Sequence, residues 1–131
     1  LNGAGGDILE RVRAFFEKKT TEAEQRGVNK NRLCFDPGIG FGKTNEENFA
    51  LIANPEKIRV PGTALLMAAS RKRAIGAVCG NPPFEDRMAG TVAAHTASVL
   101  FGADMVRAHD TFEAVQAARV ADAIKQFRKG V

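Results

Sequence analysis

The sequence predicts an α/β fold in which short parallel strands alternate with helices. Short apolar runs, such as residues 64–69, are separated along the chain by longer segments with helical periodicity, a pattern typical of strand, helix, strand units. These runs are apolar at consecutive positions rather than at alternate ones, as in strands that helices cover in a parallel sheet or barrel. We therefore expect three parallel strands, in a sheet or barrel, with flanking helices.

The expected elements follow one another in strict alternation. In chain order they are a helix at about 7–26, a strand near 32–35, a short helix at about 46–53, a strand near 64–69, a helix from about 72, a helix at about 86–101, a strand near 104–107 and a helix at about 112–129. The apolar face expected for the first helix consists of Ile8, Val12, Phe15 and Phe16. The face expected for the last consists of Val115, Ala118, Ala121 and Ile124.

A glycine-rich loop over residues 36–44 follows the first strand. Asp36 stands where the strand ends, and Gly40 is the middle one of three alternating glycines that let the backbone approach a ligand closely. Phe41 offers an aromatic ring between them. The spacing fits neither a phosphate-binding P-loop nor a dinucleotide-binding G-x-G-x-x-G pattern. A strand-ending turn, with Asp36 as a cap, is the alternative.

The other two strands also end in polar side chains. Ser70, Lys72 and Arg73 follow the second strand, and Arg107 and His109 follow the third. Because parallel strands present their carboxyl ends at one edge, we expect these groups to converge with Asp36. Such a set favours an organic anion with a flat polar ring, and it lacks the arrangements used in covalent hydrolysis.

Structural roles for the same residues stay open at this point. Ser70 is a candidate N-cap for the helix that starts near Lys72, and the basic cluster 71–73 can simply be solvated. A lone histidine such as His109 is often structural, as we expect for His95 in its apolar helix. Asp110 fits an N-cap better than a catalytic acid.

Composition and charge narrow the classes of protein to which the chain can belong. With 44% hydrophobic and 26% charged residues in 131, the chain is expected to be one globular domain. The net charge is +4, but the basic residues are scattered and Tyr and Trp are absent, which argues against nucleic-acid binding. Cys34 and Cys79 lack disulfide or metal spacing, so we expect buried, reduced thiols. No membrane span or secretory signal is recognisable, which makes the cytoplasm the expected location.

Four motifs together resemble the C-terminal half of the dihydropteroate synthase family. In chain order they are Asp36-Pro-Gly-Ile-Gly-Phe-Gly-Lys43, Ser70-Arg-Lys72, Arg87-Met-Ala-Gly-Thr91 and Arg107-Ala-His-Asp110. The resemblance runs from about residue 7 to the end of the chain. It implies part of a (β/α)8 TIM barrel and a transferase, the target of sulfonamides, that joins 6-hydroxymethyl-7,8-dihydropterin pyrophosphate to para-aminobenzoate in folate synthesis.

The resemblance also implies roles for individual residues. Asp36 would bond the pterin ring, and Lys72 would bond the pterin carbonyl and border the aminobenzoate pocket. Gly40 and Phe41 would shape the wall between the two substrates. In this family Mg²⁺ assists the departing pyrophosphate. The role implied for Arg107 and His109 is to hold that pyrophosphate.

Two departures from the family pattern and one absence accompany the resemblance. Arg73 stands where the family usually has a serine near the aminobenzoate carboxylate, and Ala108 replaces a valine. A closed barrel needs eight strands and about 250 residues. We therefore expect residues 1–131 to be a single partial domain, inactive alone, with the metal ligand in the other half and a homodimer as the full-length state.

Two other classes of function remain as alternatives. A pterin-binding methyltransferase domain of the same fold would also use the aspartate, but it would not need Arg107 and His109 as a pyrophosphate clamp. A non-catalytic fragment that only assembles with another chain would fold with its partner and bind no ligand. Retention of Asp36 and Lys72 favours the synthase.

Overall fold

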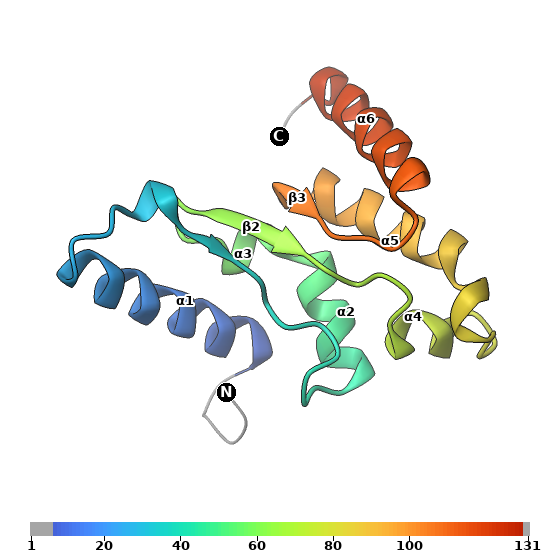
Figure 1. Cartoon of the computed structure of the whole chain (residues 1–131), viewed down its shortest axis with the longest axis horizontal. Coiled ribbons are helices and arrows are strands. Elements are labelled where there is room, and N and C mark those ends of the chain that lie inside the picture. Colours follow the sequence, from blue (N-terminus) through green and yellow to red (C-terminus); the bar gives the residue numbers. More distant parts are fainter. Residues whose placement is uncertain (1–6, 130–131) are drawn as a thin grey trace.

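The structure, a computed structural model that describes residues 7–129, has the α/β architecture that the sequence predicts (Figure 1). Its strands are β1 (Cys34–Phe35), β2 (Ala64–Met67) and β3 (Met105–Val106). Its helices are α1 (Ile8–Gln25), α2 (Asn45–Ala53), α3 (Pro55–Ile58), α4 (Arg73–Val78), α5 (Met88–Leu100) and α6 (Thr111–Phe127), with 3-10 turns η1 (Lys30–Arg32) and η2 (Phe84–Asp86).

The three strands form one parallel sheet in the order β1-β2-β3. Cys34 lies beside Ala64, and Leu66 lies beside Met105. The strands are shorter than predicted, and β2 shows why. Beyond Met67, the backbone N–H of Ala69 donates to Nε2 of His95 at 3.0 Å instead of to a neighbouring strand.

Within residues 7–129, helices cover one face of this sheet. Leu65 and Met67 are buried in the core, and Phe35 and Val106 pack against them. On the other face the side chains of Cys34 and Met105 are exposed, with their sulfur atoms 3.9 Å apart. Helices flank the sheet as predicted, and in the part of the chain that the structure describes they cover one of its faces.

Helix α1 supplies much of the covered face. Asp7 caps its N-terminus by accepting from the backbone N–H of Glu10 at 3.0 Å. Val12 and Phe16 are buried, and the Phe16 ring stacks on Phe35 with centroids 4.6 Å apart. Phe15 was predicted to share this face, but 40% of it is exposed because it lies one residue around the helix from Phe16.

The apolar face predicted for the last helix is largely exposed. Of its predicted residues only Ala121 is buried, whereas Val115 is 50% and Ile124 48% exposed. Steps of three residues turn 300° around a helix, so such a row drifts across its surface rather than along one side. Helix α6 lies against α5 at the edge of the described structure, and the drifting row leaves this contact (Figure 1).

The prediction of buried cysteines is also wrong, since Cys34 and Cys79 are both free and exposed. Cys34 lies on the uncovered face of the sheet. Partial desolvation, with smaller effects from Asp104 and Asp36, raises the pKa of its thiol, which therefore stays protonated near neutral pH. Among the described residues, no helix has the length and hydropathy needed to span a membrane.

Candidate functional site

An open cavity of about 240 Å³ lies at the carboxyl ends of β2 and β3. Its lining consists of Ala68, Ser70, Lys72, Arg107, Ala108 and His109. The predicted convergence of the second and third strand ends is therefore confirmed. One ammonium, one guanidinium and one imidazole around so small a cavity form a setting suited to an anion.

Ser70 uses its hydroxyl across the sheet rather than to cap a helix. Ser70 Oγ lies 2.6 Å from Nδ1 of His109 and accepts from the backbone N–H of His109 at 3.0 Å. The N-cap position of α4 is occupied by Lys72, which makes no side-chain capping bond. The N-cap interpretation of Ser70 is thus wrong, and this buried hydroxyl instead fixes the histidine ring.

The loops that follow β2 and β3 are also joined by contacts that lie outside the cavity. Arg71 has a positive φ of 55°, and its Nη2 donates to Oδ1 of Asp110 at 2.9 Å. The Phe84 ring lies 5.2 Å from the Arg71 guanidinium and edge-on to His109 at 5.3 Å. Asp110 does occupy the N-cap position of α6, but its carboxylate binds Arg71 and not the helix. These hydrogen bonds raise the pKa of Arg71, so its charge is permanent.

Hydrogen bonds from α5 and its N-cap hold the backbone of Arg71. Its N–H donates to Oγ1 of Thr91 at 2.8 Å, and its carbonyl accepts from Nη1 of Arg87 at 3.1 Å. Arg87 and Thr91 are the ends of the third sequence motif, which lies at the start of α5 and contacts the loop after β2. A left-handed conformation at a non-glycine residue costs free energy, and these two bonds oppose that cost.

The glycine loop folds against the same edge of the sheet. Asp36 Oδ1 accepts from the N–H of Gly38 at 2.8 Å, and the N–H of Gly40 donates to Oδ1 of Asn48 at 3.0 Å. Gly38, Gly40 and Gly42 have φ values of 75°, 88° and 67°. At Gly40 a Cβ would also lie 3.2 Å from Cδ of Lys72. Glycine at position 40 thus serves both the torsion and the close approach of the lysine.

Lys72 joins this loop to the cavity. Its Nζ donates to the carbonyl of Ile39 at 2.9 Å and lies 4.5 Å from the centroid of the Phe41 ring. The ring itself is 70% exposed. An ammonium over an aromatic face is a favourable cation–π contact. Lys72 is therefore oriented from the loop side while it lines the cavity.

Asp36 and Arg107 complete the rim. Arg107 Nη2 lies 3.5 Å from Oδ2 of Asp36, and the Arg107 side chain is 71% exposed. An ion pair this exposed adds little stability, so both groups are free to exchange it for a ligand. Arg73, the first residue of α4, is exposed and does not line the cavity. The structure thus brings together every predicted site residue except Arg73.

Sequence reasoning missed Asn48, Phe84 and the role of Thr91. Asn48 is only 3% exposed, although it is an amide that directly follows the polar residues 45–47 of α2. A buried amide needs a hydrogen-bond partner, so its position just after a glycine loop was the available signal. Phe84 offered no such signal, because its contacts join segments that are distant in the sequence.

His95 has the structural role predicted for it. It is 3% exposed, and burial lowers its pKa to about 4, so the ring is neutral and its Nε2 accepts from Ala69. Within residues 7–129 no group of three or more His, Cys, Asp or Glu side chains is placed to hold a metal ion.

The chain belongs to the pterin binding enzyme family, whose sequence profile matches residues 2–109. Its relatives include the dihydropteroate synthase of Synechocystis, 37% identical over 119 residues, which are 91% of this chain and 41% of that protein. The dihydropteroate synthase of Escherichia coli is 35% identical over 117 residues, with 89% and 41% covered. The chain thus spans about two fifths of the length of these relatives.

Solved structures give the same result for the fold. Dihydropteroate synthase from Xanthomonas albilineans with 4-aminobenzoic acid superposes with a TM-score of 0.87 at 36% identity, covering 95% of this chain and 47% of that one. The same enzyme in complex with 7,8-dihydropteroate gives 0.88 at 36% identity, covering 96% and 49%. The expectation that the three strands form the C-terminal part of a TIM barrel is confirmed.

Proposed function

We propose that the chain is the C-terminal half of a dihydropteroate synthase, which joins 6-hydroxymethyl-7,8-dihydropterin pyrophosphate to para-aminobenzoate. The observation that carries this proposal is the meeting of three strand ends on one rim, with Asp36, Lys72, Arg107 and His109 around it. The solved relatives that bind 4-aminobenzoic acid and 7,8-dihydropteroate support the substrate class. The products are 7,8-dihydropteroate and pyrophosphate.

The reaction needs binding and charge stabilisation more than covalent chemistry. The bond between the pterin methylene and the pyrophosphate oxygen breaks, and the aniline nitrogen of para-aminobenzoate attacks that carbon and then loses a proton. Negative charge grows on the pyrophosphate as it leaves. Arg107 and His109 stabilise this charge, because cationic and N–H donors fixed at the site of a growing charge lower the barrier.

The remaining residues hold the two substrates in reacting geometry. Asp36 accepts from the N–H groups of the pterin ring, and Lys72 donates to its carbonyl. Gly40 and Phe41 shape the wall between the two substrates. Arg73 does not line the cavity, so in this proposal it attracts the aminobenzoate carboxylate only through its charge, from outside the cavity. Alignment of two bound reactants supplies a large share of the rate in such reactions.

We further propose that the complete protein is a homodimer and acts in the cytoplasm. It would use Mg²⁺, whose protein ligands lie outside residues 7–129. The support for an assembly is the exposed apolar surface of α6, which includes Phe112 at 70% and Phe127 at 77% exposure. Solvent-facing phenylalanines on one helix are typical of a surface that another element covers. Intact mass measurement in solution tests this state.

A chimera tests the proposed reaction. Residues 7–129 replace the matching segment of the Escherichia coli enzyme, which is 35% identical to this chain. We expect 7,8-dihydropteroate to form, and Arg107→Gln to lower kcat about a hundredfold or more. The matched control is Arg32→Gln, which changes an exposed arginine in η1, ahead of β1. A folded chimera without turnover, or equal rates for both variants, would contradict the proposal.

A further inference from the structure

We propose that Lys43 is a positioning residue that holds the glycine loop, residues 36–44, in the shape that presents Phe41 and the Ile39 carbonyl to Lys72. Lys43 belongs to the first sequence motif, but the proposed reaction gives it no role. Its side chain lies under the loop and does not line the cavity. The effect on ligand binding rests on the proposed function, whereas the effect on loop order does not.

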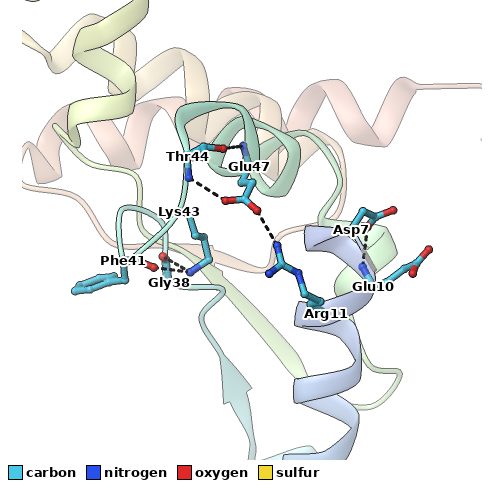
Figure 2. Close-up of polar contacts among 8 residues, drawn as sticks. All are labelled: Asp7, Glu10, Arg11, Gly38, Phe41, Lys43, Thr44 and Glu47. Atoms are coloured by element: carbon cyan, nitrogen blue, oxygen red, sulfur yellow. Dashed lines mark hydrogen bonds and ion pairs between the residues drawn. The ribbon is translucent and has the colours of Figure 1, made fainter. Parts of the chain in front are cut away.

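The ammonium of Lys43 bridges the two ends of one turn. Its Nζ donates to the carbonyl of Gly38 at 2.9 Å and to the carbonyl of Phe41 at 3.1 Å (Figure 2). The Gly38 carbonyl also accepts from the N–H of Phe41 at 3.1 Å. The ammonium is close to the backbone, since a Cβ at Gly38 would lie 3.2 Å from Nζ.

This turn needs such a bridge for two physical reasons. Glycine at three positions of the loop, two of them in the turn, leaves the unfolded backbone unusually free, so ordering the loop costs more entropy than usual. In addition, the Gly38 and Phe41 carbonyls point toward one position, where their partial negative charges repel. A positive donor at that position converts the repulsion into two charge-assisted hydrogen bonds.

The base of the loop is fixed by its own helix. Thr44 and Glu47 form a reciprocal capping box at the N-terminus of α2, with bonds of 2.9 and 3.1 Å. Glu47 Oε2 also accepts from Nη2 of Arg11 on α1 at 2.7 Å (Figure 2). The backbone next to Lys43 is therefore held in place by α2, so the hydrogen bonds of its ammonium restrain the loop.

The restrained loop in turn places groups of the candidate site. Figure 2 shows the Phe41 ring pointing away from the Lys43 ammonium, on the outer side of the loop. On that side Lys72 Nζ lies 4.5 Å from the ring centroid and 2.9 Å from the Ile39 carbonyl. Lys43 thus acts on Lys72 through the backbone of residues 38–41.

Hydrogen exchange of the full chain, followed by mass spectrometry, tests the loop order. We expect Lys43→Met to speed exchange in the peptide containing Gly40 and Phe41 by about ten- to hundredfold, because it removes two charge-assisted bonds. Lys43→Arg should restore part of the protection. Lys57→Met, at an exposed lysine of α3, is the matched control. Unchanged exchange in Lys43→Met, or an equal effect in Lys57→Met, would overturn the proposal.

Two further readings keep the result unambiguous. Exchange in α5 reports whether a variant is folded, and Lys43→Gln replaces Lys43→Met if that variant unfolds.

In the chimera we expect Lys43→Met to raise KM for the pterin substrate several-fold more than it lowers kcat. Faster loop exchange with an unchanged KM would overturn the link to the site. Absence of turnover in the unmutated chimera would instead count against the proposed function and leave the exchange result valid.

Discussion

His95 joins α5 to the end of β2 through one buried hydrogen bond, and this makes folding sensitive to acid. Its pKa is about 4 in the folded chain, against an ordinary value of 6.5. Between these values the unfolded state binds more protons than the folded state, so stability rises with pH there and falls as the solution is acidified. The full difference corresponds to about 3 kcal/mol of stability present above pH 6.5 and lost by about pH 4.

Thermal unfolding at pH 7 and at pH 4.5 checks this prediction. The melting temperature of the wild-type chain should fall more between pH 7 and pH 4.5 than the melting temperature of His95→Gln. Glutamine keeps an acceptor for the Ala69 N–H but cannot be protonated in this range. Equal losses in the two proteins would show that other groups cause the acid sensitivity.

Gly90 sets the distance between α4 and α5. A Cβ at this position would lie 2.6 Å from Cγ2 of Ile75 and 3.1 Å from Sγ of Cys79. Ile75 is 2% exposed and cannot move aside. Alanine stabilises a helix interior by about 1 kcal/mol relative to glycine, which is an upper limit for Gly90 in the first turn of α5. Here the overlap costs about 1–3 kcal/mol, so we expect Gly90→Ala to destabilise the protein by about 1 kcal/mol.

Urea unfolding measures this effect, and a second substitution tests its cause. Ile75→Leu removes the branch atom Cγ2 while keeping the side-chain volume. Adding it to Gly90→Ala should recover the lost stability, since the overlapping atom is gone. A Gly90→Ala variant that is more stable than wild type would mean that helix propensity outweighs the contact.

The elements that the sequence predicted well are those with a strong local signal. Helix α1 matches its prediction within a residue at each end, because Asp7 caps it and Gly27 follows it. Helix α3 was missed, since it has only one turn and carries no apolar periodicity, although proline is common at the first position of a helix. The exposed side of α6 could not be predicted either, because neighbouring elements decide which apolar residues are buried.

At the scale of the whole molecule, topology predicted the location of the site but not its internal bonds. Parallel strands force their carboxyl ends together, which is why Lys72, Arg107 and His109 could be grouped from the sequence. The pairing of Ser70 with His109 and of Arg71 with Asp110 could not be foreseen. Each joins residues 39 positions apart, and no local pattern encodes such a contact.

The central claim is that three strand ends form one site with a pterin part and a pyrophosphate part. Calorimetric titration of the chimera with 6-hydroxymethyl-7,8-dihydropterin, and separately with pyrophosphate, tests it most directly. Asp36→Asn should weaken pterin binding about tenfold or more and change pyrophosphate binding little, and Arg107→Gln should do the reverse. If both variants bind both ligands as tightly as the unmutated chimera does, the site has been assigned to the wrong residues.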